Sequence, residues 1–121
     1  MLVATGGALG ALLRYLLTTF SKSLFVSSIY GTFSVNIIGS FLIGYLITSN
    51  VVYNFSENFI KFFLIIGFLG SFTTFSAFSY DVVELINSKK YITSFTYVFV
   101  SIFLCIMFAY LGTLLNKFWF D

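Results

Sequence analysis

The sequence predicts an all-α membrane protein with four transmembrane helices, and two properties of the chain carry this prediction. First, 60% of the 121 residues are hydrophobic and only 8% are charged, with a mean hydropathy of +1.04. A soluble domain of this length could not bury so much apolar surface. Second, the apolar residues form four runs, and a bilayer span needs about 20 residues. Four spans use most of the chain, so we expect a single domain over residues 1–121.

The charges outside the spans are almost balanced between the two sides of the membrane. The predicted spans cover residues 2–20, 29–49, 59–86 and 91–115. An even number of spans places both termini on one side, together with Lys61 and Lys117, and leaves Lys22, Lys89 and Lys90 on the other. This gives almost no positive-inside bias. The chain could therefore form an antiparallel, dual-topology homodimer, or one or two residues could fix a single orientation.

Polar and small residues in the first span recur at helical spacing. Gly6, Gly10 and Arg14 lie four residues apart and therefore share a face. The two glycines form a GxxxG motif, which favours close helix packing. A guanidinium inside a span costs about 2.5–3.5 kcal/mol on insertion scales. Arg14 would therefore either extend to the nearer interface or stand at the mouth of an aqueous vestibule, where it would attract anions.

The second span contains one amide, Asn36, within GTFSVNIIGSFLIG at residues 31–44. An amide in the middle of a membrane needs a hydrogen-bond partner. One interpretation is an interhelical hydrogen bond worth about 1 kcal/mol. The other is a donor that faces an ion path. The amide alone does not decide between the two.

The third span interrupts its apolar run with GFLGSFTTFSAFS at residues 67–79. Gly67, Gly70 and Ser71 weaken the helix, so we expect a break near residues 70–74, in mid-membrane. Such a break persists in a membrane only where protein or a cavity satisfies the freed backbone groups. Exposed carbonyls would suit a small cation, and exposed amides and hydroxyls would suit an anion.

Two aromatic and two hydroxyl side chains follow the expected break. Phe75 and Phe78 are three residues apart, as are Ser76 and Ser79, so each pair lies on about one face. A phenylalanine ring edge carries partial positive charge and can approach an anion. Ordinary packing is the alternative for these rings, and it is favoured on spacing alone in a chain with 18 phenylalanines.

The fourth span carries a polar-to-small stripe at steps of four residues. Its members are Thr93, Tyr97, Ser101, Cys105 and Ala109. The stripe predicts either a tight helix contact or a hydroxyl-lined track, and spacing slightly favours the contact.

The residue inventory narrows the class of function. The chain has no histidine, and its carboxylates (Glu57, Asp81, Glu84 and Asp121) fall in loops or near span ends, so we do not expect an enzyme. A net charge of +2 gives no reason to expect a nucleic-acid partner. A small four-span, dual-topology multidrug-type exporter is the alternative, but that mechanism needs a membrane-embedded carboxylate. Neutral donors and one arginine favour a pore for a small anion or a neutral solute.

Three stretches together carry a specific resemblance. GGALGALLRY (6–15), GTFSVNIIGSFLIG (31–44) and GFLGSFTTFSAFS (67–79) closely resemble the Fluc/CrcB family of fluoride channels, over essentially all 121 residues. The resemblance implies a fluoride-specific channel of the plasma membrane that gives passive efflux from the cytoplasm and hence fluoride resistance. It also implies an antiparallel homodimer with two pores.

The resemblance further implies roles for individual residues. A structural sodium ion, not transported, would sit at the dimer centre and be held by the backbone carbonyls of Gly70 and Thr73. Arg14 would lie near the vestibule. The pore residues implied are Asn36, Phe75, Ser76, Phe78, Ser79, Tyr97 and Ser101. On this interpretation the rings of Phe75 and Phe78 meet fluoride with their edges and are not merely packed.

Five positions depart from the pattern of the family. Ser71 stands where a second glycine is common, and Ala77 stands where a hydroxyl residue is usual. Tyr80 and Asp81 replace an apolar residue and a glutamate, and Cys105 takes a place often held by glycine. Of these changes, only Ala77 removes a hydroxyl from the expected pore wall.

Overall fold

The computed structural model describes residues 1–25, 27–48 and 57–120, and over these ranges it is built from helices and contains no strand. The elements are α1 (Leu2–Phe25), α2 (Ile29–Thr48), η1 (Phe59–Leu69), α4 (Gly70–Phe72), α5 (Phe75–Asn87) and α6 (Tyr91–Phe120). Four helical stretches are long and apolar enough to cross a membrane: Leu2–Phe25, Ile29–Thr48, Phe59–Asn87 and Tyr91–Leu115. The four-helix prediction is confirmed. The predicted end of the second span at residue 49, residues 50–56 of the connection after it and Asp121 lie outside the described residues.

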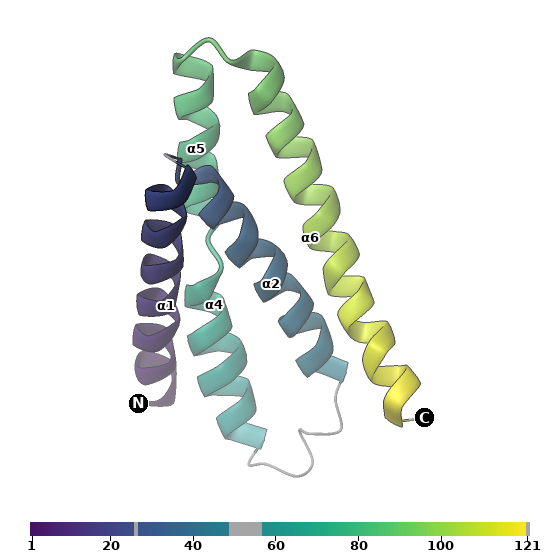
Figure 1. Cartoon of the computed structure of the whole chain (residues 1–121). Coiled ribbons are helices and arrows are strands. Elements are labelled where there is room, and N and C mark those ends of the chain that lie inside the picture. Colours follow the sequence, from purple (N-terminus) through teal and green to yellow (C-terminus); the bar gives the residue numbers. More distant parts are fainter. Residues whose placement is uncertain (26, 49–56, 121) are drawn as a thin grey trace.

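The helices alternate in direction along the chain. Figure 1 shows α1 and the η1–α4–α5 segment running one way, α2 and α6 running the other, and both termini at the same end. The most extensive helix contacts join α2 to α6 and α1 to η1. Between α5 and α6 the chain turns through Lys89, which adopts a left-handed φ of 59°. This arrangement places the third helical segment between α1 and α2.

Glycines let these helix pairs approach to backbone contact. A Cβ on Gly6 would collide with the backbone of Phe63, and one on Gly10 would collide with the backbone of Phe68. A Cβ on Gly44 would likewise meet the backbone of Ala109 on α6. Small residues at helix interfaces allow such approach in membrane proteins. The close packing predicted from GxxxG in the first span is therefore confirmed.

The third helical segment is interrupted at Thr73 and Thr74. Thr73 has φ −80° and ψ 155°, and Thr74 has φ −152° and ψ 116°, so both residues are extended. Gly70 keeps helical angles, φ −61° and ψ −30°. The interruption thus falls at the end of the predicted range 70–74, after the glycines. Gly67 instead lies against α1, where a Cβ would come 2.9 Å from the carbonyl oxygen of Val3.

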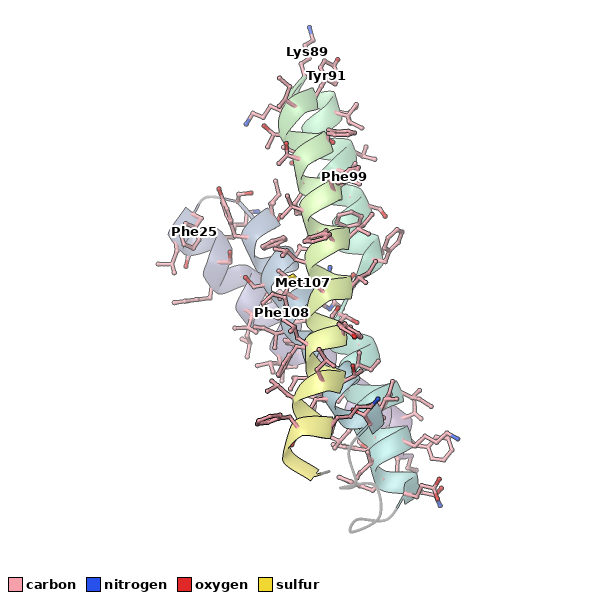
Figure 2. The ribbon with its side chains drawn as sticks, turned by 90° about the vertical axis from the view of Figure 1, so that its right-hand side faces the viewer. Phe25, Lys89, Tyr91, Phe99, Met107 and Phe108 are labelled. Atoms are coloured by element: carbon pink, nitrogen blue, oxygen red, sulfur yellow. The ribbon has the colours of Figure 1, made fainter. Side chains whose placement is uncertain are left out.

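The interruption separates two small cores, and most large apolar side chains face outward. One core contains Val35, Leu69 and Phe72, and the other contains Phe78, Leu85 and Tyr97. Figure 2 looks onto α6, whose outer surface carries Tyr91 and Phe99 with exposed fractions of 61% and 66%. An apolar exterior around a small interior is the distribution expected of a protein whose solvent is lipid.

Candidate functional site

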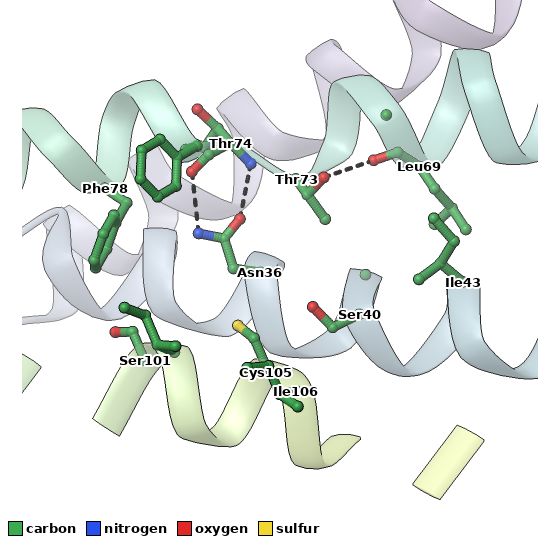
Figure 3. A pocket seen from close by; sticks show the side chains of 14 residues that line it. Asn36, Ser40, Ile43, Leu69, Thr73, Thr74, Phe78, Ser101, Cys105 and Ile106 are labelled. Atoms are coloured by element: carbon green, nitrogen blue, oxygen red, sulfur yellow. Dashed lines mark hydrogen bonds between the residues drawn. The ribbon is translucent and has the colours of Figure 1, made fainter. Parts of the chain in front are cut away.

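The extended backbone at the interruption is bound by a side chain from α2. The N–H of Thr74 donates to Oδ1 of Asn36 at 2.7 Å, and Nδ2 of Asn36 donates to the carbonyl oxygen of Thr74 at 3.1 Å (Figure 3). The carboxamide thus pairs with both polar groups of one residue, as a neighbouring backbone would. Nδ2 carries two hydrogens, so this pairing leaves one of them for a second acceptor.

Thr74 also starts the second half of the helix. Its Oγ1 accepts the N–H of Ala77 at 3.1 Å, which is the hydrogen bond of an N-cap. The same hydroxyl lies 3.1 Å from the hydroxyl of Ser76. Thr74 is therefore held from both sides, by α2 through its backbone and by α5 through its side chain.

The redirected amides leave two carbonyls without their helical donors. In a continuous helix the carbonyl of Gly70 would accept from the N–H of Thr74, and that of Thr73 from Ala77. Here the Thr74 N–H goes to Asn36 and the Ala77 N–H goes to the Thr74 hydroxyl. Unpaired carbonyl oxygens in a membrane protein are suitable ligands for a hard cation. The two carbonyl oxygens of Gly70 and Thr73 are therefore suitable ligands for such an ion.

Arg14 reaches the same segment from α1. Its Nε donates to the carbonyl oxygen of Ser71 at 3.0 Å, and its side chain is half-buried. A cation near the last carbonyls of a helix is favourable because that end carries partial negative charge. The structure thus places Arg14 against the helix interruption.

A cavity of ≈ 390 Å³ lies beside the interruption, between the third segment, α2 and α6. Figure 3 shows the residues that line it. Of the residues predicted for a site, the cavity brings together Asn36, Gly70, Thr73, Phe75, Phe78 and Ser101. The lining also contains residues that were not among the predicted site residues, namely Gly39, Ser40, Ile43, Leu69, Thr74, Ile102, Cys105 and Ile106. The four-residue spacing of Asn36 and Ser40, and of Ser101 and Cys105, is the signal that joins each pair.

The two phenylalanines at the cavity differ in their surroundings. Phe75 is 75% exposed, whereas Phe78 is 7% exposed. Their ring centroids lie 5.4 Å apart with an interplanar angle of 44°, and Phe78 meets Tyr97 at 5.2 Å and 45°. Tilted contacts of this kind direct the edge of one ring towards the face of another. Phe75 is therefore open at the protein surface, and Phe78 is fixed within the core.

The predicted hydroxyls fall into two groups. Ser101 is buried, and its Oγ has no hydrogen-bond partner among the described residues. Ser79 donates to the carbonyl of Phe75 at 2.9 Å, and Ser76 lies against Thr74. Tyr97 donates its hydroxyl to Asp81 at 3.3 Å. Ser101 therefore offers an unused donor at the cavity, while Ser76, Ser79 and Tyr97, like Arg14, lie outside the lining.

A buried carboxylate lies next to this site. Asp81 is 2% exposed, and its two oxygens accept hydrogen bonds from Ser28 at 3.1 Å and from Tyr97. The expectation that carboxylates lie in loops or near span ends does not capture this burial. Ser28 and Tyr97 are distant in sequence from Asp81, and only the packing of α2 and α6 around α5 brings them together. Asp81 is thus a buried carboxylate within the third membrane-crossing stretch, Phe59–Asn87.

Four membrane-crossing helices, an interrupted third helix and a cavity at the interruption define a multi-span membrane protein with a site between its helices. The family described as CrcB-like protein, Camphor Resistance (CrcB), matches residues 1–113, and the chain belongs to this family. The resemblance predicted from the sequence is confirmed.

Relatives from distant organisms bear one name, Fluoride-specific ion channel FluC. The protein of Methanococcus aeolicus is 34% identical over 96% of this chain and 93% of its own length. That of Flavobacterium psychrophilum is 40% identical over 95% and 94%, and that of Shewanella sediminis is 42% identical over 93% and 90%. An ion channel is not an enzyme class. With its four apolar helices, the chain is a multi-pass protein of the plasma membrane.

Proposed function

We propose that this chain forms a fluoride-specific channel that lets fluoride leave the cytoplasm passively. The observation that most directly supports this proposal is the cavity at the interrupted helix. It combines the amide of Asn36 and the unpartnered hydroxyl of Ser101 with the rings of Phe75 and Phe78. The names of the relatives support the same ion.

The chemistry of the cavity suits a small, strongly hydrated anion. Selective conduction requires groups that replace the hydration shell of the ion at close range. Amide and hydroxyl donors supply hydrogen bonds, and ring edges supply partial positive charge without binding too tightly. The described lining contains no carboxylate, which would repel an anion. No catalytic role is proposed for any residue.

Passive efflux follows from the acid–base chemistry of fluoride. Hydrogen fluoride is a weak acid that crosses membranes uncharged and ionises in a near-neutral cytoplasm, where it is trapped. An anion then leaves through a channel down its gradient, and an inside-negative potential assists it. Fluoride resistance is the physiological consequence.

The active assembly in this proposal is an antiparallel, dual-topology homodimer, with the interruption at mid-membrane. Gly70 supports a close partner, because it is exposed in the single chain and a Cβ there would meet only the carbonyl of Ile65 at 3.7 Å. The packing of one chain therefore gives no reason for a glycine at this position. The nearly equal lysine counts of the two sides support insertion in both orientations.

A structural sodium ion at the dimer centre completes the proposal. The carbonyls of Gly70 and Thr73 would hold it, two from each copy, since both have lost their helical donors. Bound there, the ion would compensate the partial negative charge of the two half-helix ends. It would stay in place and would not be transported.

Fluoride efflux from liposomes containing the purified protein tests the function. We expect fast loss of fluoride, measured with an ion-selective electrode, and little loss of chloride from a matched preparation. A folded protein that releases no fluoride, or that releases chloride equally fast, would overturn the proposal. In that case the exporter class would be tested next, beginning with Asp81.

A further inference from the structure

Two side chains from different helices bind the interrupted backbone at neighbouring points. Arg14 on α1 donates to the carbonyl of Ser71, before the interruption. Asn36 on α2 pairs with both backbone groups of Thr74, within it. Gly70 directly precedes the first of these points and Thr73 directly precedes the second, so the carbonyls of both residues lie next to the bound groups. The interruption is thus held from two sides by groups far away in sequence.

Close helix packing at glycines positions the side chains of Arg14 and Asn36 beside the interruption. On one face of α1, Gly6 packs against Phe63 and Gly10 packs against Phe68. Arg14 lies four residues further along the same face and contacts Ser71. On α2, one turn from Asn36, Gly39 leaves the space that the side chain of Thr73 occupies. A bulkier residue at these glycines would move the helices apart.

A continuous helix is the competing state of this segment. In lipid, a chain gains most by satisfying its backbone internally. If Asn36 did not accept the N–H of Thr74, the nearest helical acceptor for that N–H would be the carbonyl of Gly70. Closing the helix in this way would consume an oxygen that the extended form releases. The pairing with Asn36 therefore opposes helix closure directly.

The role of Arg14 is complementary. With the helix interrupted, the carbonyl of Ser71 loses its donor at Phe75, which the extended residues separate from it. The guanidinium replaces that donor with a charge-assisted hydrogen bond, stronger than a neutral one. Its charge also faces the negative end of the first half-helix. Arg14 thus stabilises the C-terminal end of the first half-helix, while Asn36 prevents the helix from closing.

We propose that Arg14 and Asn36 are positioning residues that hold the third helix interrupted, so that the carbonyls of Gly70 and Thr73 stay available to a cation. For Arg14 this differs from a vestibule residue that attracts anions. The identity of the cation as sodium rests on the function proposed above. The interruption itself rests on the hydrogen bonds alone.

Hydrogen–deuterium exchange of residues 70–79 in nanodiscs tests this inference. Exchange is followed in wild type, Arg14→Met and Asn36→Leu while sodium replaces choline at constant chloride. Controls are Lys22→Met, which removes a positive charge elsewhere on α1, and Ser34→Ala, which removes an exposed hydroxyl of α2. Sodium should slow exchange in wild type. Both test variants should need about tenfold more sodium for half-maximal protection, and the controls should match wild type.

The possible outcomes separate the two proposals. If wild type responds to sodium and both test variants respond at the same concentration, the positioning role is refuted while the cation site stands. If wild type shows no sodium response, the cation site and its positioning both fail, whatever the fluoride flux. A loss of protection that is equal at all sodium concentrations would indicate general destabilisation and would also count against positioning. Either test variant alone is sufficient if the other does not fold.

Discussion

At the scale of residues, the interrupted helix places chemically similar side chains in different environments. Phe75 and Phe78 are one helical turn apart, yet the first is 75% exposed and the second 7% exposed. Tyr97 and Ser101 are likewise one turn apart on α6, but Tyr97 donates to Asp81 whereas the Ser101 hydroxyl is unpartnered. Equal spacing therefore does not imply an equal role, and substitutions should separate function from stability.

Replacing each phenylalanine by isoleucine should separate the two effects. Phe75→Ile and Phe78→Ile should each reduce fluoride efflux by about tenfold, because each removes a ring edge worth roughly 1 kcal/mol. Only Phe78→Ile should also lower stability, by about 1–3 kcal/mol, since its ring is buried against Tyr97. Fluoride efflux is measured in liposomes, and stability is measured by thermal unfolding. Normal efflux in both variants would refute the role of the rings.

Replacing Asn36 by aspartate tests the amide within the proposed pathway. The variant keeps an oxygen that can accept the Thr74 N–H. It loses the donor and adds a negative charge beside the cavity. Efflux of fluoride should therefore fall, by about tenfold or more if the charge acts at a low local dielectric. An unaffected channel, assayed beside Ser34→Ala, would show that Asn36 does not face the pathway.

At the scale of elements, two kinds of glycine serve two purposes. Gly6, Gly10 and Gly44 are buried at contacts between helices, where any side chain would meet backbone. Gly70 is exposed and has open space around it. The first kind fixes how the helices cross, which in turn sets where Arg14 and Asn36 meet the third segment. In the proposed dimer, the second kind would face the partner chain.

Alanine at Gly10 and at Gly70 should therefore act differently. Gly10→Ala should lower the free energy of unfolding by about 1–3 kcal/mol, because its methyl group would overpack the contact with Phe68. Gly70→Ala should leave the unfolding of the single chain nearly unchanged. Thermal unfolding in detergent measures both variants. Equal losses would mean that the glycine contacts do not determine helix packing.

The start of α5 gives a second element-scale prediction. Thr74→Val removes the hydroxyl that accepts the Ala77 N–H but keeps the shape of the side chain. An N-cap of this kind contributes about 1 kcal/mol, so the variant should lose that much stability. Thr74→Ser keeps the hydroxyl and should therefore retain most of the stability that the valine variant loses. Chemical denaturation in the same detergent measures the stability of both variants. Equal stability of Thr74→Val and Thr74→Ser would contradict the N-cap role of the hydroxyl.

At the scale of the whole molecule, orientation in the membrane decides whether the proposed dimer can form. Both termini lie at one end of the bundle (Figure 1). Lys61 and Lys117 are on the helices near that end, and Lys22, Lys89 and Lys90 belong to the other. An antiparallel pair requires chains of both orientations in one bilayer. A lysine count that differs by two or more between the two sides should therefore control activity without touching the cavity.

Two charge-shifted variants test this directly. Lys22→Gln with Lys89→Gln and Lys90→Gln leaves two lysines on one side and none on the other, and Lys61→Gln with Lys117→Gln leaves none and three. Each variant should give a single orientation and little fluoride efflux. Co-expression of the two should restore efflux. Orientation is read from labelling of Ser88→Cys, in a Cys105→Ala background, with a membrane-impermeant maleimide. Full activity of either variant alone in one orientation would refute the antiparallel dimer.

The sequence by itself determined the membrane class, the four helices and the family. These follow from apolar length and from local motifs, which are read along the chain without knowledge of folding. It also indicated an interruption near residues 70–74, because glycine and hydroxyl residues weaken a helix locally. The shared face of Gly6, Gly10 and Arg14 was likewise predictable, since helical periodicity alone fixes it.

Only the tertiary structure decided what the polar residues bind. The carboxamide of Asn36 meets Thr74, the guanidinium of Arg14 meets Ser71, and Asp81 is buried between Ser28 and Tyr97. The interruption falls at the threonines, after the glycines, because side chains from α1 and α2 replace its lost helical partners. Such contacts join segments far apart in the chain, and helix crossing fixes them. A local GxxxG pattern indicates that a helix packs closely, but it does not identify the helix that packs against it.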